Sequence, residues 1–207
     1  MMKPLTKRQL AAQATREKLL ETAKALVEKD GLANITIEAI AKAAGVATGT
    51  FYTYFAKKED ILYTLTHETY AQIRERSETH QGLFEERLQF FMTEFAGYIE
   101  AGGVKLCQEW IKNTVDPDRI THPYPKAKLS MDLESLSTLL TEGLRRGELR
   151  PETPVEELSR MLLELLYGEM LCWAMQAGAY SFRERTERFT QHWLPSLLRP
   201  YLVKKTL

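Results

Sequence analysis

The chain has 207 residues, 44% of them hydrophobic and 27% charged, which is typical of a soluble globular protein with one large or two small domains. It carries 28 Lys and Arg against 28 Asp and Glu, so its net charge neither favours nor excludes nucleic acid as a partner. Residues 1–60 hold ten of the basic and seven of the acidic residues, whereas residues 61–207 hold 18 and 21. This asymmetry fits a phosphate-facing module before a neutral or acidic body, although a solvated helix surface produces the same imbalance.

Metal-binding, disulfide and catalytic patterns are missing from the sequence. Cys107 and Cys172 are far apart and lie in no Cys/His spacing suited to zinc, so we expect neither a metal site nor a disulfide framework. The amino terminus has no apolar segment behind its positive charges, and no apolar run approaches the roughly 18 residues of a membrane span, which predicts a cytoplasmic protein. We predict no cofactor and no enzymatic activity, because the histidines also lack metal or triad spacing; they are His67, His80, His122 and His192.

Apolar residues recur at helical spacing along nearly the whole chain, which predicts an all-α protein. The first helix begins after Leu5 and ends near Lys29, where Gly31 supplies a C-cap. Thr36 precedes the next apolar stretch and is the expected N-cap of a short second helix. The first helix is marked by the stripe Leu19, Leu20, Ala23, Leu26 and Val27.

The rest of the chain predicts a series of further helices. A leucine stripe at positions 129, 133, 136, 140 and 144 marks a long one, which Gly147 and Pro151 end. A proline-containing loop is expected over residues 116–125. The expected helices cover residues 48–54, 57–78, 84–102, 104–114, 129–144, 155–177 and 182–203.

Residues 36–55 have the pattern of a helix-turn-helix. Ile37, Ile40 and Ala41 place one apolar face of the first short helix toward the core. Ala44 and Gly45 are small enough for the two helices to cross closely, and Gly45 can adopt the left-handed conformation of the turn. The sequence therefore predicts a compact head in which the second short helix is held against the first.

This second short helix has an unusual surface. Phe51 and Phe55 are four residues apart and are expected to pack inward. The remaining surface lacks long charged side chains and offers hydroxyls for phosphates or base edges, aromatic bodies for thymine methyls, and a glycine that permits close backbone approach. The alternative is that the aromatic residues only pack a small helical domain. The residues of this surface are Thr48, Gly49, Thr50, Tyr52, Thr53 and Tyr54.

Lys57 and Lys58 open the helix that follows. Their charge, together with the N–H groups at a helix start, suits them to hold a phosphate. Such contacts position a reading helix on the duplex without reading its sequence.

The runs Ala44-Gly45-Val46-Ala47, Gly49-Thr50-Phe51-Tyr52, Tyr54-Phe55 and Lys58-Glu59 resemble the TetR family of bacterial transcriptional regulators. The resemblance covers residues 13–73 and implies an amino-terminal three-helix DNA-binding domain. It implies a helical ligand-binding and dimerisation domain over residues 74–207. It also implies a sequence-specific regulator, a repressor that a small molecule releases from its operator.

Carried over position by position, the resemblance implies two kinds of DNA contact. Ala47 belongs to the same site but departs from the serine that is common there, which removes one hydroxyl contact. The position of Thr48 is often a long polar residue in the family, so operator preference is not transferable. Phosphate contacts are implied for Thr36, Tyr52, Tyr54 and Lys58, with Lys57 added from its charge and place; groove contacts are implied for Thr48, Gly49, Thr50 and Thr53.

A homodimer is expected because one short recognition helix reads only a half-site. The last two helices are the predicted interface, where two apolar stripes suffice for a four-helix bundle across a two-fold axis. The alternative is that part of each stripe faces its own core. The stripes are Leu158, Met161, Leu162, Leu165 and Leu166, and Phe189, Trp193, Leu197 and Leu198.

The body also contains aromatic and sulfur-bearing side chains suited to an apolar ligand pocket. Plain core packing is the alternative for each of them. Glu109, Glu164 and Glu169 fall among apolar neighbours, which leaves a cationic ligand open, while Cys107 is expected to be a buried, unreactive thiol. The candidate pocket residues are Phe91, Phe95, Cys107, Trp110, Tyr124, Tyr167, Met170 and Trp173.

The predicted mechanism is a shift between DNA-competent and DNA-incompetent dimers when a small-molecule effector binds the body. The sequence does not decide between repression and activation. Two rivals remain: a structural DNA-binding protein without an effector, and a helical enzyme. Double-stranded operator DNA and an unidentified effector are the expected partners.

Overall fold

The computed structural model describes residues 6–61, 64, 72–73, 75–77, 79–115 and 123–203, without the side chains of Ala33, Asn113 and residues 123–128. These residues form helices joined by turns, with no strand among them, which confirms the all-α prediction. Outside the helices, one antiparallel bridge joins Leu149 and Leu202. The chain divides into two compact units, Met1–Thr66, here called the head, and His67–Leu207, here called the body.

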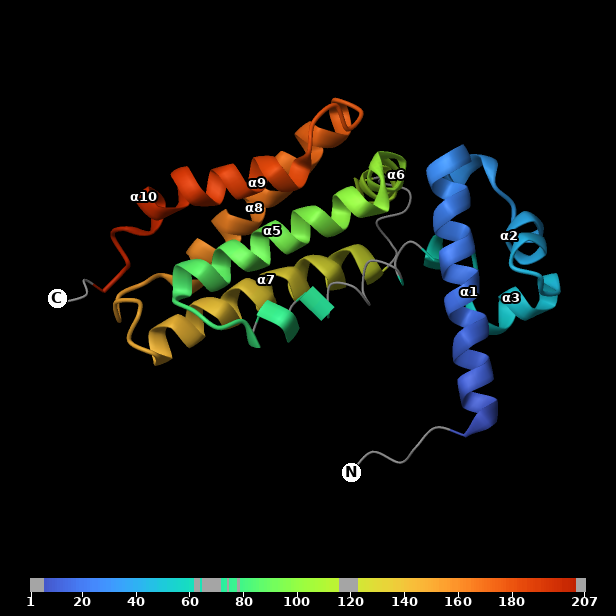
Figure 1. Cartoon of the computed structure of the whole chain (residues 1–207), viewed down its shortest axis with the longest axis horizontal. Coiled ribbons are helices and arrows are strands. Elements are labelled where there is room, and N and C mark those ends of the chain that lie inside the picture. Colours follow the sequence, from blue (N-terminus) through green and yellow to red (C-terminus); the bar gives the residue numbers. More distant parts are fainter. Residues whose placement is uncertain are drawn as a thin grey trace. The chain divides into compact units, whose positions relative to one another are not determined.

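The head contains helix α1 (Lys7–Asp30), a 3-10 turn (Leu32–Asn34), α2 (Ile37–Ala43) and α3 (Thr48–Tyr54) (Figure 1). Thr6 caps α1, since its side chain accepts a hydrogen bond from the backbone N–H of Gln9. The backbone N–H of Thr6 in turn donates to the side-chain oxygen of Gln9. Gly31 ends the helix with a φ of 79°, a conformation that costs glycine little. The expected limits of the first helix are confirmed.

Buried apolar residues from all three helices form the core of the head. The face of α2 predicted to point inward is buried at Ile40 and Ala41, with Ile37 half-buried. Each fully buried leucine, isoleucine or phenylalanine side chain stabilises the fold by roughly 1.5–3 kcal/mol. The core residues are Leu19, Leu20, Ala23, Val27, Ile40, Ala41, Ala44, Phe51 and Phe55.

The body contains α5 (Phe84–Gly102), α6 (Val104–Val115), α7 (Pro123–Arg145), α8 (Val155–Met175), α9 (Phe182–His192) and α10 (Leu194–Leu198). Figure 1 shows α5 lying along α9. This pair and the pair of α7 and α8 make the most extensive helix contacts in the described body. The larger of its apolar cores is built from α5, α7, α8 and α10. No helix in the described part of the chain is long and apolar enough to cross a membrane.

Two expected helix boundaries differ in the structure, and a third expected helix is only partly described. The last predicted helix, over residues 182–203, is wrong as one element: it breaks at Trp193, and Pro195 stands in the first turn of α10, where its missing N–H leaves no bond unmade. The loop predicted over residues 116–125 is too long, since α7 already begins at Pro123 for the same reason. Half of the helix predicted over residues 57–78 lies outside the described residues, and the described positions 59–61, 64, 72–73 and 75–77 are helical.

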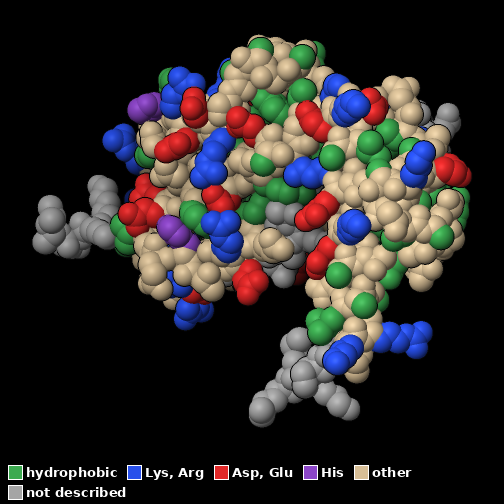
Figure 2. All heavy atoms as spheres, turned by 45° about the vertical axis from the view of Figure 1, so that its right-hand side comes forward, with side chains coloured by type: hydrophobic (Ala, Val, Ile, Leu, Met, Phe, Trp, Pro, Cys, Tyr) green, Lys and Arg blue, Asp and Glu red, His purple; other side chains and the backbone are tan. Residues whose placement is uncertain are grey.

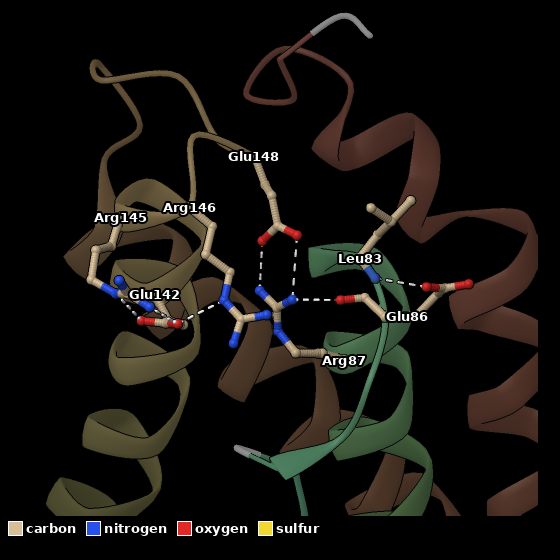
Figure 3. Close-up of polar contacts among 8 residues, drawn as sticks. Leu83, Glu86, Arg87, Glu142, Arg145, Arg146 and Glu148 are labelled. Atoms are coloured by element: carbon tan, nitrogen blue, oxygen red, sulfur yellow. Dashed lines mark hydrogen bonds and ion pairs between the residues drawn. The ribbon is translucent and has the colours of Figure 1, made fainter.

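A buried ion pair fastens the start of α5 to the turn that follows α7 (Figure 3). The guanidinium of Arg87, 1% exposed, bonds both carboxylate oxygens of Glu148 at 2.6 and 3.3 Å and the carbonyl of Gly82 at 2.7 Å. Nearby on the surface, hydrogen bonds from Arg145 and Arg146 lower the pKa of Glu142 to about 2. The ion pair of Arg87 and Glu148 is bidentate and buried, so it contributes more to stability than the exposed pairs of Glu142.

Candidate nucleic-acid interface and ligand site

Two phenylalanines hold α3 in the head. Phe51 is fully buried and Phe55 is 4% exposed, and their ring centroids lie 5.4 Å apart. The guanidinium of Arg16 on α1 lies 5.7 Å from the Phe55 ring centroid. The inward packing predicted for both phenylalanines is confirmed, and it fixes which side of α3 faces away from the core.

The other residues of α3 form an exposed or half-buried surface. The Tyr52 side chain is 55% exposed, and Gly49 and Thr53 are exposed as well. Thr48, Thr50 and Tyr54 are half-buried. A Cβ added to Gly49 would meet no atom within 4 Å, so the protein's own packing does not require glycine there. This surface combines hydroxyls, aromatic bodies and a bare backbone position without a long charged side chain.

The turn between α2 and α3 is tight. Gly45 has a φ of +69°, and its N–H donates to the carbonyl of Lys42 at 3.0 Å. The N–H of Val46 donates to Ala41 at 2.9 Å, and Ala44 is fully buried at the crossing. Small residues and one left-handed glycine therefore let the two short helices cross closely, as the sequence predicted.

The two short helices begin differently. The Thr36 hydroxyl accepts a hydrogen bond from the N–H of Ala39 at 3.1 Å, which confirms its predicted role as an N-cap. Ala47, the N-cap of α3, provides no side-chain bond. The departure from serine at this position thus removes a capping oxygen, a loss of about 1 kcal/mol in typical helices.

The two lysines after α3 are placed differently. Lys57 is exposed, whereas the half-buried Lys58 donates from Nζ to the carbonyls of Leu32 at 2.8 Å and Ile35 at 3.0 Å. Lys58 therefore ties the segment before α2 to the segment after α3, a role that its position in the motif did not indicate. Its phosphate contact stays a prediction.

An acidic residue also stands at the start of the helix after α3. The Asp60 carboxylate accepts from the N–H groups of Ala56 and Lys57 at 3.0 and 3.1 Å. Two of the N–H groups that we expected to help hold a phosphate thus have a partner within the chain. On the face drawn in Figure 2, Lys and Arg are interspersed with Asp and Glu and do not gather in one basic patch.

The candidate pocket residues of the body fall into two adjoining apolar clusters. Phe91 and Phe95 are buried in the larger core, whereas Cys107, Met170 and Trp173 are buried in a smaller one. Tyr167 on α8 packs against both clusters, and Trp110 packs against the smaller one. The side chain of Tyr124 lies outside the described residues.

Tyr167 stands at the junction of the two clusters. Its ring lies 6.3 Å from that of Phe95, nearly parallel, and 5.9 Å from that of Trp110, edge to face. Its hydroxyl donates to the carboxylate of Asp132 on α7, whose side chain is fully buried. Sequence reasoning missed Asp132, although an acid within the leucine stripe of α7 was a visible signal. A polar pair therefore sits among aromatic rings in the interior of the body.

The contacts of Cys107 and Trp173 indicate structural roles. Burial raises the pKa of Cys107 to about 12, so its thiol stays protonated and unreactive at neutral pH, as predicted. Trp173 donates from Nε1 to the carbonyl of Tyr180 at 2.8 Å and stacks on Phe182 at 5.8 Å. These contacts hold the turn between α8 and α9. Burial also raises the pKa of Glu169, which accepts a hydrogen bond from Thr186.

The surface described on α3 falls within a segment that known proteins share. Residues 19–64 match the model of bacterial regulatory proteins of the tetR family. The chain belongs to the TetR family. It is therefore a DNA-binding transcriptional regulator, and its relatives are regulators and not enzymes.

Individual relatives extend the likeness into the body. The chain is 27% identical to the fatty acid metabolism regulator protein of Bacillus subtilis over 169 residues, 78% of this chain and 84% of that protein. It is 47% identical to the regulator EthR of Mycobacterium tuberculosis over 47 residues, 23% of this chain and 22% of that protein. Among solved structures, FadR of B. subtilis in complex with stearoyl-CoA is 25% identical, with a TM-score of 0.70, covering 84% of this chain and 95% of that one.

Proposed function

We propose that this TetR-family regulator is a homodimeric repressor that leaves its operator when a long-chain acyl-CoA thioester binds in the body. The observation that carries the DNA-binding half is the geometry of α3: Phe51 and Phe55 bury one side, and the hydroxyl-rich side is left exposed. Since such a regulator works on genomic DNA, we place it in the bacterial cytoplasm.

The DNA contacts are divided between groove and phosphates. Thr48, Gly49, Thr50 and Thr53 lie in the major groove, where the short side chains allow close approach of the helix backbone. Tyr52, Tyr54 and Thr36 contact phosphates through their hydroxyls, and Lys57 contributes charge. The Thr36 hydroxyl already accepts a bond from Ala39, and its proton remains to donate to a phosphate oxygen.

The dimer forms through α8 and the end of α9. Several large apolar side chains there are exposed: Leu165 by 36%, Met175 by 77% and Trp193 by 69%. Isolated exposed apolar residues are ordinary, but their accumulation on two neighbouring helices favours a covered face. Leu158, Leu162, Leu166 and Leu198, which the sequence also offered for this interface, are buried in the core of their own chain.

The effector class rests on the relatives and on the interior of the body. One relative is the fatty acid metabolism regulator protein of Bacillus subtilis, and the related structure of FadR is a complex with stearoyl-CoA. The clusters around Tyr167 offer aromatic and sulfur-bearing side chains to an acyl chain. The pair of Tyr167 and Asp132 adds one polar point to this apolar lining.

A ligand series tests the effector class. Acyl-CoAs of two to eighteen carbons, free CoA and free fatty acids are each added to the complex with an operator selected from random DNA. We expect long acyl-CoAs to raise the thermal midpoint of the protein and to release DNA in a mobility-shift assay, because they bind one state of the dimer better. Free CoA and short acyl-CoAs do neither. Equal effects of CoA and stearoyl-CoA would reject the class.

A matched pair of variants tests the interface. Leu165→Glu places a charge on the exposed face of α8, and Leu129→Glu makes the same change on the exposed side of α7. We expect the first to give monomers in light scattering and to lose operator binding, while the second stays dimeric. Two dimeric variants with unchanged operator affinity would reject this interface.

The second candidate is a DNA-binding protein without an effector, which the interspersed charges on the face drawn in Figure 2 do not favour. Such a protein would bind random and selected DNA with similar affinity at a fixed salt concentration. It would also gain no thermal stability from any acyl-CoA. The same two assays therefore separate it from the repressor.

A further inference from the structure

A hollow lies on the surface of the body, between α5, α9 and the residues just before α5. Its volume is about 340 Å³, at the small end of the range for ligand pockets. It shares no lining residue with the aromatic clusters proposed to hold the effector. Its lining includes His80, Phe90, Thr93, Glu94, Arg183 and Glu187.

Thr93 is a lining residue of this hollow and carries an unused hydrogen-bonding group. Thr93 is 9% exposed, and its buried Oγ1 has no hydrogen-bond partner among the described residues. Other helical hydroxyls of this chain bond the carbonyl four residues earlier, as Ser77 does to Ile73 at 2.7 Å and Ser159 to Val155 at 2.7 Å. A buried hydroxyl left unpaired costs about 1–3 kcal/mol, so a polar group of a ligand would be favoured beside it.

Two aromatic rings, those of His80 and Phe90, form one wall of the hollow. The rings of His80 and Phe90 are stacked at 4.3 Å with an interplanar angle of 11°, and the guanidinium of Arg76 lies 5.5 Å from the Phe90 ring. Such a wall suits the methylene groups of a short aliphatic chain.

The charge of the hollow is negative. The Glu94 carboxylate bridges Arg76 at 2.7 Å and Arg183 at 3.1 Å, so these three groups together carry one positive charge, which the carboxylates of Glu86 and Glu187 outweigh by one. Glu86 and Glu187 instead accept bonds from neutral donors, the backbone N–H of Leu83 and the amide of Gln191. Two carboxylates without a paired cation thus remain at the edge of the hollow, where a positive charge is attracted.

We propose that this hollow is a second ligand site, which binds a small aliphatic ammonium compound. One ammonium group lies between Glu187 and Glu86 and donates to the Thr93 hydroxyl, and the alkyl chain lies on the ring of Phe90. The site is separate from the proposed effector pocket, so ammonium binding and acyl-CoA binding are independent measurements.

Titration calorimetry on the full-length protein without DNA tests the proposal. The probes are putrescine and spermidine, with 1,4-butanediol as a neutral analogue of the same length, all at constant ionic strength. We expect saturable binding of one amine per chain and no heat from the diol, because the hollow selects the charge. Absence of saturable heat with both amines, or equal heats from putrescine and butanediol, would overturn the proposal.

Two substitutions localise the binding. Thr93→Val removes only the hydroxyl, and Glu187→Gln removes one exposed charge without threatening the fold. We expect each to weaken putrescine by at least about fivefold, while Glu157→Gln, an exposed acid in the first turn of α8, leaves it unchanged. Unchanged affinity in Glu187→Gln, or the same loss in Glu157→Gln, would mean that amines bind the acidic surface generally.

Discussion

The contacts within the head and those within the body of this regulator differ in how far apart their residues lie in the sequence. In the helix-turn-helix, Phe51 packs on Phe55 and Thr36 caps Ala39, so neighbouring residues orient the reading helix α3. In the body, Arg87 and Glu148 are 61 positions apart, and Tyr167 and Asp132 are 35 apart. A short motif can therefore specify the head, whereas the interior of the body exists only once distant helices have packed.

The largest effect on stability is expected at Arg87, whose partner Glu148 is distant in the sequence. Arg87→Met leaves the Glu148 carboxylate, 19% exposed, without its bidentate partner. We expect the free energy of unfolding to fall by about 3–5 kcal/mol, because a mostly buried charge loses its compensation. Urea unfolding followed by circular dichroism measures this. Arg145→Met, which breaks an exposed pair with Glu142, should change little; similar losses in both variants would contradict the contrast.

The next effect separates binding from folding in the head. Gly49→Ala adds a methyl group into open space in the free protein and removes a flexible glycine from a helix. We expect an unchanged or higher thermal midpoint but a roughly ten- to hundredfold weaker operator complex, because the methyl keeps the backbone from the base edges. Mobility shift and thermal unfolding give the two readings.

Gly147→Ala is the control for this prediction. Its φ of +67° disfavours alanine, so stability should fall while the folded protein keeps its operator affinity. Unchanged DNA binding by Gly49→Ala would remove Gly49 from the proposed interface.

Lys58 departs from the local character of the head, since it bonds carbonyls 26 and 23 positions away. Lys58→Met should lower the free energy of unfolding by about 1–3 kcal/mol, because two carbonyls lose a charged donor. Lys57→Met should leave stability unchanged but reduce the salt dependence of operator binding by about one counterion. Equal stability of the two variants would show that the Lys58 bonds contribute nothing.

The smallest effect concerns a single carboxyl on α8. Burial raises the pKa of Glu169 in the folded protein, so its protonated form stabilises the fold at low pH and this contribution is lost as pH rises through the raised pKa. Glu169→Gln should therefore raise the thermal midpoint by about 1–3 °C at pH 7.5 and by nothing near pH 4. Glu164→Gln, exposed on the same helix, is the control. A gain that persists at pH 4 would contradict the assignment.

Sequence reasoning was most successful where periodicity and caps act alone. The end of α1 follows from Gly31 and the end of α5 from Gly102-Gly103, and α3 has the predicted bounds Thr48–Tyr54. Capping and turn formation depend on adjacent residues, so the local sequence is sufficient to predict them. It failed at Trp193 and Pro123, where a proline in a first turn can begin a helix as well as end one.

The sequence by itself determined the helix-turn-helix: small residues at the turn, two inward phenylalanines and a hydroxyl-rich surface occur within twenty consecutive positions. Three features depend on how the chain packs: Lys58 bonds two carbonyls within the head, Asp132 pairs with Tyr167, and Thr93 lines a surface hollow. The reason is physical. A side chain's periodicity shows whether it faces a core, but its polar partner depends on which distant helix packs there.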